Sequence, residues 1–136
     1  MRPGKKSLSI VRGNSVTEPA VTYPLLSAAT CPQVAPERDS TIRIVHLGIG
    51  AFHRAHQAFY TEQVMQLTAE RNWMIAGVSL RSSAVANQLN PQQGLYTLVT
   101  TSAAGTEQQL IQSVAKVLVA PQNPQAVIEL MASPEV

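Results

Sequence analysis

The sequence predicts an α/β fold in which parallel strands alternate with helices. Three segments carry this prediction: an apolar, β-branched run over residues 41–47, helical periodicity over residues 52–68, and a second apolar run over residues 73–79. Strand, glycine turn, helix and strand succeed one another within about 38 residues, the size of a βαβ unit. The chain is therefore expected to contain an incomplete, doubly wound parallel sheet.

The first strand is predicted from Thr41 to Leu47, because most of these residues are β-branched or apolar and Gly48 marks the end of the run. In the helix that comes next, apolar side chains recur three and four positions apart, which is typical of an amphipathic helix. They form two neighbouring rows: Phe52, Ala55 and Phe59, and then Tyr60, Val64 and Leu67.

Shorter elements are predicted after the second strand. A short helix over residues 83–89, capped by Ser82 or Ser83, ends at Asn90-Pro91. Residues 95–100 form a strand by composition, and a turn leads to one further strand within residues 107–119, which predicts a β-hairpin. A last helix is expected at residues 125–131. No strand is expected after it, which is why the sheet is predicted to be incomplete.

Residues 1–39 are predicted to form an irregular leader, and residues 40–136 the partial domain. Five of the chain's nine prolines lie in the leader, where no apolar periodicity survives between them. Proline fixes φ and removes a backbone donor, so such a segment forms neither a steady helix nor an inner strand.

The composition excludes several classes of protein. Hydrophobic residues make up 45% of the chain and charged residues 13%, which excludes disorder throughout. The formal charge of +2 is too small to indicate nucleic acid as a partner. The single cysteine, Cys31, excludes an internal disulfide, and no apolar run approaches the roughly 18 residues of a membrane helix. We expect a cytoplasmic protein with neither a membrane nor a nucleic-acid partner.

The turn Gly48-Ile49-Gly50 lies after a predicted strand and opens a predicted helix, which is the setting of a dinucleotide-binding turn. There, the first glycine allows the sharp bend and the second lets a diphosphate approach bare backbone at a helix start. His53 stands where a third glycine or an alanine is usual. From this pattern alone, two glycines in an ordinary strand–helix turn remain an alternative.

The longer string over residues 44–58, IVHLGIGAFHRAHQA, resembles the nucleotide-binding signature of the mannitol dehydrogenase family. These are polyol-specific long-chain dehydrogenases and reductases, which act on pairs such as mannitol and fructose or mannonate and fructuronate. In that signature G-x-G-x-F-H-R-A-H replaces the usual third glycine, so His53 agrees with the family. Residues 77–82 and 94–97 agree as well.

The resemblance implies a Rossmann-like domain of an oxidoreductase that transfers a hydride between NAD or NADP and a polyol or sugar acid. It implies that the dinucleotide contacts the turn, the start of the helix and the end of the second strand. The residues concerned are Leu47, Gly48, Ile49, Gly50, Ala51, Phe52, His53, Arg54, Ser79 and Arg81.

The catalytic residues that the resemblance implies, Lys-x4-Asn-x2-His in a C-terminal domain, are not found here. Lys116 is the only lysine after the leader, and Asn123 lies at the wrong spacing from it. We therefore predict no catalytic residue, an absent catalytic domain and a fragment that is inactive alone. The alternative is a nucleotide-binding remnant or sensor without catalysis.

The residues after the second strand suggest the type of nicotinamide cofactor. An NAD site usually has an acidic residue about 20 positions beyond the glycines, but no carboxylate lies between Arg71 and Thr106. Arg81 occupies this zone among several serines and would favour the 2′-phosphate of NADP. The alternatives are a solvated loop residue or a stacking platform for adenine.

His53 and His56 are spaced i, i+3 on the predicted helix, which raises the question of a metal site. Zinc needs a third ligand and usually a fourth, and the remaining candidates are His46 and Cys31. We expect no metal. A small metal-binding protein that uses His46, His53 and His56 is the third hypothesis, and the favoured one is that these histidines line the cofactor cleft or fix the helix start by hydrogen bonds.

Overall fold

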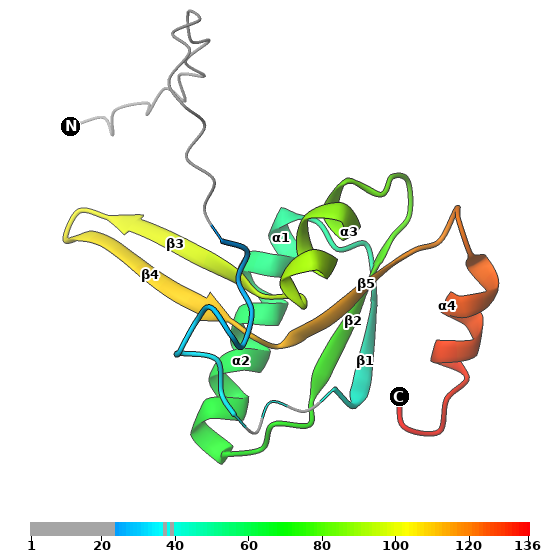
Figure 1. Cartoon of the computed structure of the whole chain (residues 1–136), viewed down its shortest axis with the longest axis horizontal. Coiled ribbons are helices and arrows are strands. Elements are labelled where there is room, and N and C mark those ends of the chain that lie inside the picture. Colours follow the sequence, from blue (N-terminus) through cyan, green and yellow to red (C-terminus); the bar gives the residue numbers. More distant parts are fainter. Residues whose placement is uncertain (1–23, 37, 39) are drawn as a thin grey trace, which may run out of the picture.

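A parallel sheet flanked by helices forms the body of the molecule, and an antiparallel hairpin projects from it (Figure 1). The computed structural model describes residues 24–36, 38 and 40–136. The sheet has the order β1 (Ile42–Leu47), β2 (Met74–Ser79), β5 (Val114–Val119), and both pairs are parallel. The hairpin consists of β3 (Tyr96–Ser102) and β4 (Gly105–Ile111). The predicted α/β, Rossmann-like fold is confirmed, and so is the hairpin.

The central strand β2 is buried at every position, as expected for its apolar sequence between two parallel neighbours. His46 of β1 is paired with Gly77 of β2, and Val78 with Leu118 of β5. Because the strands are parallel and in this register, their carboxyl ends meet at one edge of the sheet. Leu47 and Ser79, the last residues of β1 and β2, both lie at this edge.

The predicted helix over residues 52–68 is interrupted at His56. It consists of α1 (Ala51–Ala55) and α2 (Gln57–Thr68), and the backbone of His56 departs from helical geometry with φ −122° and ψ −79°. The amide of His56 still donates to the carbonyl of Phe52 at 3.0 Å, which joins the two helices. The prediction of one continuous helix was therefore wrong at this residue.

The face that these helices bury differs from the two apolar rows of the sequence. Phe52 and Leu67 are 77% and 85% exposed, and Tyr60 and Val64 are each more than half exposed. The buried positions of the helices are instead His53, Ala58, Glu62 and Met65. The apolar spacing thus located the helix but not its inner face, because small and polar residues occupy that face.

The remaining helices are short. They are α3 (Ala84–Leu89), which continues as a 3₁₀ turn over Asn90–Gln92, and α4 (Pro124–Met131). Ser83 precedes α3 without a capping side-chain bond, whereas the Asn123 side chain accepts from the Ala126 amide at 3.0 Å. In the described part of the chain, no helix is long and apolar enough to cross a membrane.

Residues 107–119 contain parts of two strands rather than the single predicted one. Gln112 and Ser113, both buried, form the corner between β4 and β5. The Ser113 hydroxyl donates to the carbonyl of Ala58 in α2 at 2.7 Å. This corner carries the chain from the projecting hairpin back into the parallel sheet.

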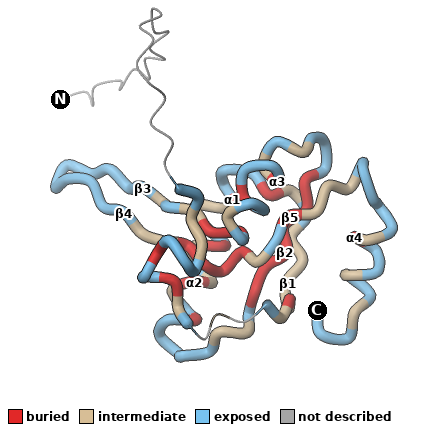
Figure 2. The backbone as a smooth tube through the Cα atoms, viewed as in Figure 1, coloured by how far each residue is buried: buried red, intermediate tan, exposed pale blue. Residues whose placement is uncertain are grey.

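The main hydrophobic core lies between the sheet and α1–α3, and Figure 2 shows the buried segments concentrated there. Its buried members are Ile49, Ala58, Ile75, Ala86, Leu89, Ile111, Val114 and Val117. Burial of such side chains stabilises the fold by about 1.5–3 kcal/mol each for the larger ones.

The described part of the leader, residues 24–36 and 38, forms turns and contains no helix or strand. Cys31 and Val34 are buried against Leu95, at the base of the hairpin. The guanidinium of Arg38 donates to the carbonyls of Gln112, Gln93 and Val114 at 2.9, 2.8 and 2.7 Å. This part of the leader therefore packs on the domain. The rest of the predicted leader, residues 1–23, 37 and 39, lies outside the described residues.

Candidate functional site

The glycine turn connects β1 to α1 and is fixed to the end of β2. The amides of Gly48 and Ile49 both donate to the carbonyl of Val78, at 2.8 and 3.2 Å, and the amide of Gly50 donates to the carbonyl of Gly48 at 2.8 Å. Gly48 has φ +101°, a conformation that residues with a side chain rarely adopt. A Cβ atom at Gly48 or Gly50 would meet nothing within 4 Å, so open space lies beside both.

Ile49 points in the opposite sense, into the core. Its side chain is buried and lies against Gly77 of β2, where an added Cβ would come within 2.8 Å of the Ile49 Cβ. Gly77 thus allows the turn to approach the sheet closely. Sequence reasoning did not identify this contact, although a glycine inside an apolar strand is a signal of close approach.

A hollow of about 370 Å³ brings the two predicted contact zones together. The turn forms one wall, and the end of β2 with the loop after it forms the other. Ser79, the last residue of β2, is buried, and Arg81 in the loop is exposed. The lining residues are Gly48, Ile49, Gly50, Ser79, Leu80, Arg81 and Ser82. We call this the first hollow; among the described residues, no acidic side chain lines it.

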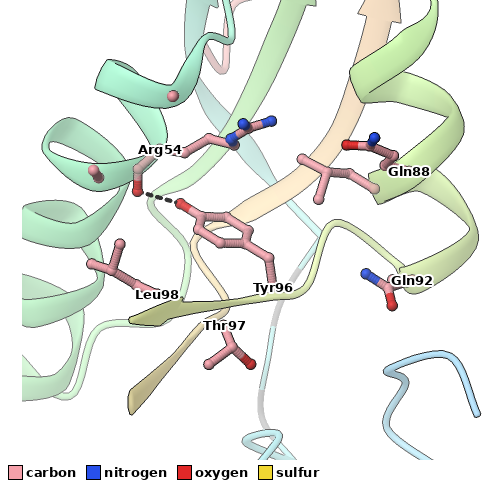
Figure 3. A pocket seen from close by; sticks show the side chains of 9 residues that line it. Arg54, Gln88, Gln92, Tyr96, Thr97 and Leu98 are labelled. Carbon is pink, nitrogen blue, oxygen red and sulfur yellow. Dashed lines mark hydrogen bonds between the residues drawn. The ribbon is translucent and has the colours of Figure 1, made fainter. Parts of the chain in front are cut away.

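Ala51 and Arg54 line a different, second hollow of about 530 Å³ between α1, α3 and β3 (Figure 3). The hydroxyl of Tyr96 donates to the backbone carbonyl of Arg54 at 2.6 Å and thereby ties β3 to α1. Burial is the main cause that raises the pKa of the Tyr96 hydroxyl. The phenol therefore stays protonated and acts as a donor here. Sequence reasoning placed Tyr96 in a stretch that agrees with the family, residues 94–97, but did not assign it to the site.

The other three predicted site residues, Leu47, Phe52 and His53, line neither hollow. His53 is buried, and its ring stacks on that of His46 with a centroid distance of 3.8 Å. Its Nδ1 lies 3.2 Å from Oε1 of Gln57, and because that oxygen only accepts, Nδ1 carries the proton. Burial, followed by the neighbouring His46, lowers the pKa of His53 to about 4. His53 therefore stays neutral at pH 7.

The position usually held by a third glycine is thus filled by a ring packed between α1 and β1. His53 Nε2 is buried and has no hydrogen-bond partner among the described residues. The His53 ring thus stacks on His46 and contacts Gln57 at the start of α2, and it lines neither hollow.

His56 faces a different environment from His53. Its Nδ1 lies 2.8 Å from the carbonyl of Phe52 and therefore donates to it, and its ring stacks on Phe52 with a centroid distance of 4.1 Å. Within the described ranges, no three His, Cys, Asp or Glu residues come together in a way that could hold a metal ion.

A comparison with models of protein families identifies the family to which this arrangement belongs. The model of the mannitol dehydrogenase Rossmann domain matches residues 42–136. The chain belongs to the mannitol dehydrogenase family. This confirms the resemblance found in residues 44–58. The family match also begins at the first residue of β1 and so covers both hollows.

Mannitol 2-dehydrogenases are among the curated members of this family that the chain resembles. That of Aspergillus fumigatus is 45% identical over 94 residues, which are 68% of this chain and 19% of the relative. That of Pyrenophora tritici-repentis is 40% identical over 94 residues, 68% of this chain and 17% of the relative. The chain thus spans about a fifth of the length of these relatives.

Two solved structures from polyol dehydrogenases share the fold. Pseudomonas fluorescens mannitol 2-dehydrogenase, in a ternary complex with NAD and D-mannitol, has a TM-score of 0.73 and 36% identity, covering 83% of this chain and 25% of that one. A substrate-free D-sorbitol dehydrogenase has a TM-score of 0.64 and 34% identity, covering 74% and 22%. At these identities the likeness extends beyond the fold class to the sequence.

Proposed function

We propose that this domain binds a nicotinamide dinucleotide, with the diphosphate at the first hollow, for an oxidoreductase that acts on a polyol or sugar acid. One observation carries the proposal. The bare backbone of Gly48 and Gly50 faces the same hollow as Ser79 and Arg81, at the carboxyl ends of two parallel strands. Dinucleotides bind at this edge of such sheets. The related Pseudomonas enzyme is a complex with NAD and mannitol, which supports the same ligand class here.

The hydrogen bonds of the turn indicate which amides are left for a diphosphate. Those of Gly48, Ile49 and Gly50 are used within the turn and by β2. The first amides of a helix have no partner within the helix, so Ala51 and Phe52 offer the donors. Phe52 thus contributes through its amide, although its ring is exposed.

NADP is expected to bind at least as well as NAD. The first hollow contains the guanidinium of Arg81 together with Ser79 and Ser82, and its described lining has no carboxylate that would accept from a ribose 2′-hydroxyl and repel a 2′-phosphate. Charge-assisted, bidentate contacts favour a phosphate at such a group. If Arg81 instead stacks on adenine, NADH and NADPH bind equally and Arg81→Gln weakens both to the same extent.

Among the described residues, the two hollows lack a group that could exchange the hydroxyl proton of an alcohol. No His, Lys, Asp or Glu lines either of them, and Tyr96 is held as a hydrogen-bond donor. Hydride transfer from an alcohol needs such a base. We therefore propose that this domain supplies the dinucleotide site and that the base belongs to another part of the enzyme, so that this chain alone does not turn over mannitol, fructose or fructuronate.

Fluorescence titration of the 136-residue chain with NADH and NADPH tests the proposal. Gly50→Glu places a carboxylate in open space at an ordinary φ of −78°, so the fold should survive while the diphosphate is repelled. We expect dinucleotide binding to fall at least about tenfold, because the added carboxylate places a like charge beside the diphosphate. Gln108→Glu, an exposed position on β4, is the matched control. Equal binding by wild type and Gly50→Glu, or no binding by wild type, would contradict the proposal.

A further inference from the structure

The amides proposed for the diphosphate lie on a very short helix. Helix α1 spans five residues, and its junction with α2 departs from helical geometry at His56. So short a helix has little stability of its own, because few of its hydrogen bonds are internal. Contacts from outside α1 therefore decide where the Ala51 and Phe52 amides lie. One such contact is the hydrogen bond from the Tyr96 hydroxyl to the Arg54 carbonyl, at 2.6 Å.

Tyr96 lies at the base of the hairpin, where β3 begins and β4 ends. It is paired with Ile111 in the antiparallel register. The outer part of the hairpin projects from the body of the molecule, and most of its residues are exposed (Figure 1). A two-stranded hairpin has only marginal stability in water. The position of Tyr96 therefore depends on how the base of the hairpin is attached to the rest of the fold.

The guanidinium of Arg38, in the leader, attaches this base on both sides. Its Nη2 donates to the Gln93 carbonyl, shortly before β3, at 2.8 Å, and its Nε donates to the Gln112 carbonyl, directly after β4, at 2.9 Å. Nη2 also donates to the carbonyl of Val114, the first residue of β5, at 2.7 Å. A guanidinium presents its donors in a rigid, planar fork. One half-buried side chain therefore holds both ends of the hairpin against the parallel sheet.

Arg38 lies outside residues 42–136, to which the model of the family's Rossmann domain matches, and it lines neither the first nor the second hollow. We propose that Arg38 is a positioning residue for the dinucleotide site. It holds the base of the hairpin, the hairpin holds the Tyr96 hydroxyl against the Arg54 carbonyl, and this bond sets the position of the α1 amides. The effect on dinucleotide binding rests on the proposed function, whereas the position of α1 in the free chain does not.

The test compares the wild-type chain with Arg38→Gln, Tyr96→Phe and the double variant. Arg38→Gln removes the fork, and Tyr96→Phe removes the bond to α1. The control is Asn123→Ala, which lowers stability by removing a capping bond confined to the start of α4. Circular dichroism confirms that each variant is folded at the temperature of measurement. If Arg38→Gln does not fold, Arg38→Lys takes its place, because lysine keeps the charge but lacks the fork.

The first measurement needs no ligand. Amide NMR spectra of the isotope-labelled chain report the surroundings of the Ala51 and Phe52 amides directly. Arg38→Gln and Tyr96→Phe should shift these two signals in the same direction, because both variants release α1 from the hairpin. Asn123→Ala should leave the two signals in place, although it too lowers stability. Unmoved signals in Arg38→Gln overturn the inference, whatever the chain binds.

Fluorescence titration with NADH then measures the consequence for binding. Arg38→Gln and Tyr96→Phe should each weaken NADH binding about threefold or more, and Asn123→Ala by less than about twofold, because lost stability alone does not change the affinity of the folded protein. The double variant should bind no more weakly than the weaker single variant, since both act through one bond.

Unchanged NADH binding by Arg38→Gln overturns the inference, and so do two losses that multiply in the double variant, because Arg38 would then not act through Tyr96. A wild-type chain that does not bind NADH contradicts the proposed function instead. The spectra of the free chain still decide the role of Arg38 in that case.

Discussion

The fully buried carboxylate of Glu62 accepts a hydrogen bond from the backbone amide of Gln112 at 2.9 Å. Glu62 lies on α2, and Gln112 lies at the corner where the chain leaves the hairpin for β5. The same carboxylate accepts from the Gln66 amide at 2.9 Å and lies 3.9 Å from the Arg71 guanidinium. One acidic side chain therefore connects α2 and the segment that follows it to the corner before β5, 50 positions further along the chain.

Glu62→Ala should lower the free energy of unfolding by about 2–3 kcal/mol, because it leaves the buried amide of Gln112 without an acceptor and removes one negative charge beside Arg71. Glu62→Gln should cost less, since its one amide oxygen still accepts. Urea unfolding followed by circular dichroism measures both. Glu107→Ala, an exposed position on β4, is the control and should change stability by less than about 0.5 kcal/mol. Equal stabilities of Glu62→Ala and Glu107→Ala would show that the bond contributes nothing.

The close approach of Ile49 to Gly77 predicts a coupled pair of substitutions. Gly77→Ala forces the Ile49 side chain to move and should destabilise the fold by about 1–3 kcal/mol, the cost of overpacking. In an Ile49→Ala background the same substitution should cost less, because the Cδ1 and Cγ1 atoms that obstruct it are gone and only the Cβ atom, at 2.8 Å, remains. A double-mutant cycle from urea unfolding measures the coupling, and simple additivity of the two substitutions would refute it.

The parts that sequence reasoning predicted well are those where one local signal decides the structure. The β-branched run at residues 42–47 and the glycine turn fix β1 and the bend after it, and the resemblance over residues 44–58 indicated the family. The break at His56 has no proline or glycine to mark it. The corner at Gln112 and Ser113 depends on partners in α2, which lie 50 and 55 positions away in the chain.

In the candidate site, too, the sequence predicted which residues take part but not how their side chains are arranged. The sequence predicted two contact zones for one ligand, whereas the structure distributes the residues of the first zone between two hollows, with Ile49 also packing inward and His53 buried. Side chains that succeed one another on a helix point in different directions, so a motif names the residues of a site without saying which way each one faces. Tyr96 joins the site through a hydrogen bond across 42 positions, which no local pattern could indicate.

Tyr96→Phe tests whether that hydrogen bond stabilises the start of the helix. The substitution removes the donor to the Arg54 carbonyl and should lower stability by about 1 kcal/mol. Thermal unfolding gives the value. Tyr60→Phe is the matched control, because Tyr60 is 63% exposed and its substitution should change stability by less than about 0.5 kcal/mol. Comparable losses in the two variants would indicate that the Tyr96 hydroxyl has no specific role.

The buried His53 predicts an acid-sensitive fold. Its pKa is lowered to about 4 in the folded protein, against a usual value near 6.5. Between pH 6.5 and 4, His53 is therefore protonated in the unfolded chain but neutral in the folded one. The contribution of His53 to the free energy of unfolding is therefore fully present above pH 6.5. It is lost as the pH falls towards 4, by about 3 kcal/mol in all. Urea unfolding at pH 7.5, 6, 5 and 4 measures it. In His53→Gln this part of the pH dependence should vanish, whereas His56→Gln, at an exposed position, should keep it. Parallel stability profiles for wild type and His53→Gln would mean that another group causes the acid sensitivity.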